Sequence, residues 1–254
     1  PEKKFVAPLG DRYLNFYNHV LAEVRKKHPG ARVIGYAYEN YLEAPKKTRV
    51  SDGVIIEFVP RSYFPYDREE SEYFRKQWLG WRAAGARDMK LRPNYMLAGG
   101  NFPFDQGRII LEDFAFAFTN GMTRCCFDSF RGSHATHAVM DYALIRAFRD
   151  PTHGYDRARA EMLDAFGSAK REVARYFDAI AAHTAKWTLP AFREISWKNS
   201  MGGNLGGGSF FNCPSILEEY FDDAFFPRMN GLLAAARTAA RAATSTASAI
   251  PRPP

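Results

Sequence analysis

The sequence predicts an α/β fold that corresponds to half of an eight-stranded (β/α)8 barrel, with a helical region appended to it. Two observations carry this prediction. Short β-rich segments alternate with longer segments of helical periodicity in the first 150 residues, and the remainder is helical and rich in Ala, Arg and Glu. The length of 254 residues, of which 46% are hydrophobic and 25% charged, is ordinary for a globular protein with a substantial core.

Four segments have the length and composition of buried strands. "RVIGYAYEN" is rich in β-branched and aromatic residues, and "GVIIEFVP" closes at a proline. Because helical patterns separate these segments, we expect parallel strands that lie next to one another in chain order. The predicted strands are residues 33–39, 54–59, 88–95 and 122–128.

Helical periodicity fills the segments between and after the strands. The first helix is predicted at 11–27, with Asp11 as its N-cap and Pro29-Gly30 beyond its end. The other helical patterns are 67–84, 105–120, 135–149, 155–187 and two within 213–245. The predicted organisation is a half barrel at 1–150, a helical region at 151–247 and a disordered tail at 248–254.

A glycine-rich segment, "NSMGGNLGGGSFF" at 199–211, interrupts the helical region. Glycine loops can bind phosphate, but such loops follow a strand and lead into Gly-Lys-Ser/Thr, and this segment does neither. We therefore interpret it as a flexible connector.

Charge and hydropathy exclude several classes of protein. The net charge is +7, but the basic residues are scattered and do not alternate with aromatic residues, so we expect no nucleic-acid partner. No run of about eighteen apolar residues occurs, so no membrane span is expected. The first residues contain no charged segment followed by an apolar one, so no signal peptide is expected in this stretch.

The stretch "RCCFDSFRGSHATH" at 124–137 has the residue types of a metal site. Adjacent side chains on a strand point to opposite faces, so Cys125 and Cys126 cannot both bind one ion. Free cysteine also behaves as a small buried hydrophobic residue, and we predict that the pair belongs to the core, without zinc or any cofactor. A weaker alternative is a metal-dependent enzyme that uses Asp128, His134 and His137. Cys213 is expected to be a free thiol.

Polar side chains occur at the end of every predicted strand. The carboxyl ends of barrel strands meet on one face, where barrel enzymes carry their chemistry. Glu57 lies inside a strand and needs a partner, which Arg92 or Arg61 could supply. The candidate catalytic residues are Glu39 and Asp128. The candidate substrate-binding residues are Tyr38, Glu57, Arg61, Arg92, Asn94 and Tyr95. Nearby aromatic residues that fit a sugar cleft are Tyr36, Tyr63, Phe64 and Tyr66.

These segments also carry a family resemblance. "VIGYAYENYLEAPK", "VIIEFVPRSYFP", "LRPNYMLAGGNFP", "NGMTRCCFDSF" and "DPTHGYDRARAEMLDAFGSAKREVARYFDAI" resemble the domain of unknown function 4838 family over about residues 11–180. The resemblance implies a TIM barrel of glycoside-hydrolase type with a helical segment after it. It also implies secretion or a periplasmic location in bacteria that consume polysaccharides. The group Arg92-Pro93-Asn94-Tyr95 resembles one branch of the family only.

The resemblance implies that the four strands are strands five to eight of the barrel. A first half that carries the proton donor would then lie upstream. Glycoside hydrolysis uses two carboxylates, about 5–5.5 Å apart for retention or about 6.5–9.5 Å apart for inversion. Carboxylates beside arginines keep their charge, which suits a base, a nucleophile or a hydroxyl acceptor better than a proton donor.

Two functions follow as hypotheses. The first is a glycoside-hydrolase-like protein that acts on O-glycosidic bonds of a polysaccharide or oligosaccharide, with Glu39 or Asp128 as base, nucleophile or substrate-orienting group. The second is a non-catalytic carbohydrate-binding module on the same scaffold. A hydrolase requires at least two carboxylates in one cleft, whereas a binding module needs only aromatic and neutral polar groups.

Overall fold

The computed structural model describes residues 9–62, 64–95, 103–127, 134–188, 190–191 and 217–248. The chain forms two compact units. The first, which we call the sheet unit, consists of Pro1–Leu97 and Glu112–Phe130. The second, the helical unit, consists of Ala98–Leu111 and Arg131–Pro254.

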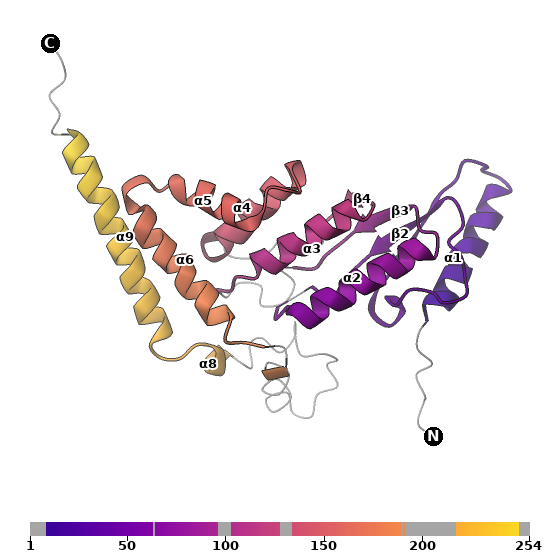
Figure 1. The fold of residues 1–254 in the computed structure, drawn as a ribbon, viewed down its shortest axis with the longest axis horizontal. Helices are drawn as coiled ribbons and strands as arrows, with labels where there is room; N and C mark the ends of the chain where they lie inside the picture. The colour runs from indigo at the N-terminus through magenta and orange to yellow at the C-terminus, as the bar shows by residue number, and fades with distance from the viewer. Residues whose placement is uncertain are drawn as a thin grey trace, which may run out of the picture. The chain divides into compact units, whose positions relative to one another are not determined.

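The sheet unit contains a four-stranded parallel sheet in the order β1-β2-β3-β4 (Figure 1). The predicted parallel sheet and its sequential order are therefore confirmed. The strands end earlier than the sequence predicts. Beyond the paired residues, each ladder continues by one backbone hydrogen bond, from the N–H groups of Val59, Arg92 and Cys126 to the carbonyls of Ala37, Phe58 and Leu91. The strands are β1 Val33–Ala37, β2 Val54–Phe58, β3 Asp88–Leu91 and β4 Met122–Cys125.

Helices connect the strands in the βαβ manner, with one exception. Helix α1 (Gly10–Arg25) precedes β1, α2 (Arg68–Ala83) joins β2 to β3, and α3 (Gly107–Thr119) joins β3 to β4. Residues 38–53, which join β1 to β2, contain the short 3-10 helix η1 (Glu39–Tyr41) and no α-helix. An irregular crossover therefore replaces one helix of the regular pattern.

The start of α1 differs from the prediction. Leu9 is the N-cap residue and makes no side-chain capping hydrogen bond. Asp11, the predicted N-cap, lies inside the first turn, and its carboxylate accepts backbone hydrogen bonds from Lys46, Lys47 and Thr48 instead. The N-cap prediction is wrong because the crossover offers Asp11 three donors that no local pattern reveals.

One face of the sheet packs against helices. Gly35 on β1 faces the ring of Tyr17 on α1, and Phe58 on β2 lies 5.6 Å and 5.5 Å from the ring centroids of Phe74 and Trp78 on α2. Phe58, Phe74 and Trp78 are fully buried. Each such side chain stabilises the fold by about 1.5–3 kcal/mol through removal of apolar surface from water. This helix-covered face is the core of the sheet unit.

The opposite face of the sheet carries charged side chains. The strand register places Tyr36, Glu57, Lys90 and Arg124 in one row across the four strands. Ile34 and Tyr36, on β1, are exposed, whereas Glu57 in the centre is buried. A charged row across a parallel sheet is unusual, because such sheets are normally apolar on both faces. We call this the charged face.

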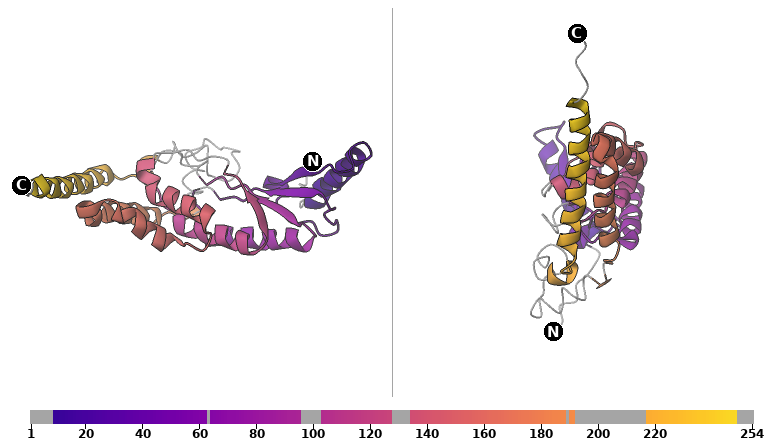
Figure 2. Two further views of the ribbon diagram at one scale, coloured as in Figure 1. Left: turned by 90° about the horizontal axis from the view of Figure 1, so that it is seen from above. Right: turned by 90° about the vertical axis from the view of Figure 1, so that its left-hand side faces the viewer.

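The helical unit has a core of its own. Helices α6 and α9 lie side by side, and α4 and α5 pack against each other (Figures 1 and 2). Its helices are α4 His134–Arg149, α5 Tyr155–Asp164, η2 Gly167–Ala169, α6 Lys170–Thr184, α8 Leu217–Tyr220 and α9 Phe225–Ser248. The core is formed by apolar side chains from α4, α5, α6 and α9, among them Val139, Leu163, Phe177, Ile180, Phe225 and Met229. The predicted connector at 199–211 lies outside the described residues, and the domain boundary at residue 150 stays a prediction.

Candidate functional site

The carboxyl ends of β1, β2 and β3 bring most of the predicted site residues to one edge of the sheet. Tyr38 and Glu39 follow β1, Arg61 follows β2, and Arg92 and Asn94 follow β3. Parallel strands in adjacent positions end on the same side, so these residues share the carboxyl edge although they are more than fifty positions apart in the sequence.

Glu57 is the carboxylate at the centre of the charged face. Its Oε1 lies 3.0 Å from Nζ of Lys90 and 3.3 Å from Nε of Arg92. The residue is 4% exposed, and a buried carboxylate is tolerated when cations compensate its charge. The predicted pairing with Arg92 is therefore confirmed. Lys90 was not predicted, although Asp88, Lys90 and Arg92 alternate in sequence and hence lie on one side of β3.

Arg92 connects the carboxylate to an aromatic ring. Its guanidinium carbon lies 5.7 Å from the ring centroid of Tyr36, within the range of a cation–π contact. The backbone N–H of Arg92 also donates to the carbonyl of Phe58 at 2.9 Å, which extends the β2–β3 ladder by one residue. Arg92 is therefore held by its backbone as well as by its side chain, and the planar guanidinium is oriented before any ligand binds.

A second cluster occupies the same face nearer the start of β3. Asp88 accepts hydrogen bonds from Arg32 and Thr123 and lies 3.5 Å from Nη2 of Arg124. Burial alone would raise the pKa of Asp88, but the hydrogen bonds from Thr123 and Arg32 outweigh it and lower the pKa. Asp88 thus fixes Arg32 and Arg124 around one ionised carboxylate.

Glu39 and Arg61 form an exposed ion pair at the edge. Arg61 Nη2 lies 4.0 Å from Oε2 of Glu39, and both side chains are about half exposed. Glu39 has a φ of 48°, and among the described residues it is the one non-glycine residue with a positive φ. Non-glycine residues adopt this left-handed conformation at a cost, and such outliers cluster at functional sites.

Asn94 and Tyr95 lie deeper than an open cleft would place them. Asn94 is 2% exposed, and its Oδ1 has no hydrogen-bond partner within the described part of the chain. Tyr95 is 3% exposed, and its ring centroid lies 5.5 Å from that of Phe127. Burial raises the pKa of Tyr95 well above its usual range, and the charge of Asp113 adds to the effect. Asn94 therefore offers a buried acceptor, whereas Tyr95 packs as an aromatic residue.

Other predicted cleft residues belong to the interior or lie outside the described residues. Phe64 is fully buried, and the hydroxyl of Tyr66 donates to Oδ2 of Asp113 at 2.5 Å. Ser71 and Arg75 donate to the second oxygen of Asp113, so this network joins α2 to α3. Tyr63 and Asp128 lie outside the described residues.

The two adjacent cysteines differ in environment. Cys125 is half-buried, and burial raises the pKa of its thiol to about 12. Cys126 is exposed, so the prediction that both belong to the core is wrong for this residue. The reason is that Cys126 lies just beyond the end of β4, which is the edge strand of the sheet. Cys213 falls outside the described residues.

The histidines near this stretch make local contacts. Nδ1 of His134 lies 2.8 Å from Oδ2 of Asp141, seven positions along helix α4. The ring of His137 is buried and lies 4.6 Å from that of Phe104. Among the described residues, no group of three or more His, Cys, Asp or Glu side chains could hold a metal ion. The absence of a metal remains an expectation, because Asp128 is not among these residues.

No helix in the described part of the chain has the length and hydropathy needed to cross a membrane.

Comparison with known proteins gives one match. Searches of curated proteins and of solved structures found no match. The family described as "Domain of unknown function (DUF4838)" matches residues 2–178, which include the whole parallel sheet and the charged face. The chain therefore belongs to this family.

Proposed function

We propose that the carboxyl edge of the sheet is a carbohydrate-binding surface of a glycoside-hydrolase-like protein. In this proposal β1 to β4 are strands five to eight of a (β/α)8 barrel that acts on O-glycosidic bonds. The observation that carries the proposal is the group formed by Glu57, Lys90, Arg92 and Tyr36. This group lies on the charged face, one residue before the strand ends, and so adjoins the edge where barrel enzymes bind their substrates.

The chemistry of this group suits a polyhydroxylated ligand. Carboxylates accept hydrogen bonds from hydroxyl groups, and Lys and Arg donate to hydroxyl oxygens. The ring of Tyr36 is 40% exposed and offers an apolar face for the C–H side of a sugar ring. Asn94 adds a buried acceptor without a partner among the described residues, which a bound hydroxyl would satisfy.

The roles within a hydrolase follow from the charges. Glu39 pairs with Arg61, and Glu57 pairs with Lys90 and Arg92, so both carboxylates lie beside cations. A neighbouring cation favours the ionised form of a carboxyl group, whereas a proton donor must stay protonated. We assign Glu39 to hydroxyl binding or base chemistry, Asp128 to base or nucleophile chemistry, and the proton donor to a residue outside this group.

The same pairing supports the alternative function. A carbohydrate-binding module without hydrolytic activity needs oriented polar groups and an aromatic ring, but no proton donor. Because both described carboxylates at the edge are paired with cations, the geometry fits this alternative as well. Cleavage of the saccharide separates the two functions. A secreted or periplasmic location would suit either of them.

The first test measures binding and cleavage by this chain on a panel of neutral and acidic oligosaccharides. We expect Glu39→Gln and Arg61→Gln each to weaken saccharide binding by about three- to tenfold, the loss of one hydrogen bond to a charged group. Both side chains are half exposed, so neither change is expected to unfold the protein. Isothermal titration calorimetry gives the affinity, and mass spectrometry of the sugars reports cleavage.

The matched control is Lys26→Gln. Lys26 also forms an exposed ion pair, with Glu23 at 2.7 Å, but it lies at the end of α1, which leads into the amino end of β1. Binding should be unchanged in this variant. If no saccharide binds, or if binding survives Glu39→Gln, Arg61→Gln and Arg92→Ala alike, the carboxyl edge is not the sugar site. Cleavage that is lost in Asp128→Asn would select the hydrolase over the binding module.

A further inference from the structure

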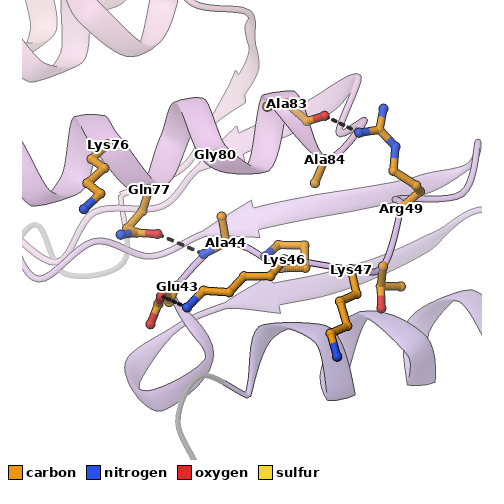
Figure 3. A pocket seen from close by; sticks show the side chains of 12 residues that line it. Glu43, Ala44, Lys46, Lys47, Arg49, Lys76, Gln77, Gly80, Ala83 and Ala84 are labelled. Atoms are coloured by element: carbon orange, nitrogen blue, oxygen red, sulfur yellow. Dashed lines mark hydrogen bonds and ion pairs between the residues drawn. The ribbon is translucent and has the colours of Figure 1, made fainter.

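A hollow lies where the crossover from β1 to β2 passes between α1 and α2. It is a cavity of about 450 Å³ on the helical side of the sheet unit (Figure 3). One wall is the crossover and the other is the second half of α2. The lining residues are Glu43, Ala44, Pro45, Lys46, Lys47, Thr48, Arg49, Lys76, Gln77, Gly80, Ala83 and Ala84.

The crossover side of the cavity is anchored on α1. The carboxylate of Asp11 accepts the backbone N–H groups of Lys46 and Lys47 at 2.9 Å each, and that of Thr48 at 2.6 Å. Three successive amides bound to one carboxylate fix the path of the backbone. The positions from which Lys46 and Lys47 extend are therefore set before any ligand arrives, which lowers the entropic cost of binding.

The crossover is also anchored on α2. The side-chain oxygen of Gln77 accepts the N–H of Ala44 at 2.9 Å, and Arg49 donates from Nη1 to the carbonyl of Ala83 at 2.5 Å (Figure 3). Hydrogen bonds thus join the crossover to α2 at both ends of the cavity, in addition to its contacts with α1.

The charge of the cavity is strongly positive. Lys46, Lys47, Arg49 and Lys76 line it together with one carboxylate, that of Glu43. Nζ of Lys46 lies 3.5 Å from Glu43, and Arg49 is bound to a neutral carbonyl. Within the described part of the chain, Lys47 and Lys76 form no ion pair. Even when the charge of Asp11 behind the crossover is included, four cationic side chains outnumber two carboxylates, so the uncompensated charge of the cavity is cationic.

We propose that this cavity is an oxyanion site that takes a phosphate or sulfate group. None of the lining residues is aromatic, so the cavity offers no stacking surface for a sugar ring or a nucleobase. Lysine ammonium groups bind phosphate as point charges, and the guanidinium of Arg49 adds planar donors. The group can belong to a free small anion or to an ester on a glycan. This site shares no residue with the carboxyl edge and does not depend on the function proposed there.

The test is calorimetric titration of the full chain with inorganic pyrophosphate, inorganic sulfate and a sulfated oligosaccharide. We expect saturable binding that weakens as the salt concentration rises from about 50 to about 300 mM, because screening shortens the reach of the lysine charges. The double variant Lys47→Gln, Lys76→Gln should bind at least about tenfold more weakly. Tighter binding of the oligosaccharide than of the two inorganic anions identifies a glycan ester, and the reverse identifies a free anion.

The matched control removes two lysines that do not line the cavity. Lys27→Gln, Lys186→Gln lowers the net charge by the same amount, and both side chains are exposed. This variant should bind as the parent protein does. Equal weakening in the two double variants would show that binding reports net charge alone, and a complete lack of saturable binding would also overturn the proposal. Retained saccharide binding in the Lys47, Lys76 variant would separate this site from the carboxyl edge.

Discussion

Asp11 shows how one carboxylate can fix a distant segment. It accepts three amide hydrogen bonds from residues 46–48, about thirty-five positions away. Burial of the side chain would raise its pKa, but the hydrogen bonds from Lys46, Thr48 and Lys47 outweigh this and lower the pKa to about 2. The ionised form is therefore the one that holds the crossover.

This pairing predicts a pH dependence. Because the folded pKa of Asp11 is below its ordinary value of 3.8, its stabilisation is present above about pH 4 and is lost as the pH falls toward 2. Asp11→Ala should lower the free energy of unfolding at pH 7 by about 1–2 kcal/mol, the range for a lost capping interaction. The difference between variant and parent should shrink toward pH 2 in urea titrations. A difference that is constant from pH 7 to pH 2 would contradict the assigned role.

The sequence predicts the interaction partner of a single residue when that partner lies on a neighbouring strand. The pairing of Glu57 with Arg92 followed from the need to compensate a charge inside a strand. Asp11 was assigned to the N-cap because a local pattern cannot show donors about thirty-five residues away. The burial of Asn94 and the left-handed φ of Glu39 depend on packing at the strand ends. Neither can be predicted from the identity of the residue.

Strands and helices were predicted more completely than single residues. Alternation of β-rich and helical segments is a repeated signal, so all four strands and their parallel order follow from it. The strand ends were placed too late, because the β-rich composition of "YAYEN" continues beyond the last ladder pair at Ala37 and Phe58. The cationic cavity was not predicted, since its lysines come from an irregular crossover and from α2 and form no motif.

The contact between α1 and β1 yields a prediction about packing. A Cβ atom added to Gly35 would lie 2.2 Å from Cδ2 of Tyr17, and the hydroxyl of Tyr17 donates to the carbonyl of Tyr36 at 3.0 Å. The ring therefore has little freedom to move aside. Gly35→Ala should lower the free energy of unfolding by about 1–3 kcal/mol, the usual cost of overpacking.

Urea denaturation followed by far-UV circular dichroism measures this effect. Gly30→Ala is the matched control, because an added Cβ at Gly30 meets nothing within 4 Å. The control should leave stability within about 0.5 kcal/mol of the parent protein. Equal stability of the Gly35 and Gly30 variants would mean that α1 does not pack on β1 as described.

The chain as a whole divides its apolar core between two units. The sheet unit is built around the helix-covered face of β1 to β3, and the helical unit around a cluster from α4, α5, α6 and α9. Composition and periodicity indicate a change of character after the last strand, but they do not locate the division, because it depends on which side chains meet. Helix α3 illustrates this, since its residues up to Leu111 belong to the helical unit and those from Glu112 onward to the sheet unit.

Separate cores predict separate responses to mutation, and Phe225 gives a sharp test. Its ring is 1% exposed and lies 4.5 Å from that of His183 and 4.7 Å from that of Phe221. Phe225→Ala should cost about 3–5 kcal/mol through lost burial and the cavity it leaves. The neighbouring Phe226 is 52% exposed, so Phe226→Ala is the matched control and should cost far less.

Amide hydrogen exchange shows which helices and strands lose protection when Phe225 is replaced by Ala. In Phe225→Ala, the amides of α6 and α9 should exchange faster, because their protection depends on the core of the helical unit. The amides of β2, whose side chains are all buried in the sheet unit, should keep their protection. If protection of β2 falls by the same factor as that of α6, the two units unfold as one cooperative body, and each core then depends on the other.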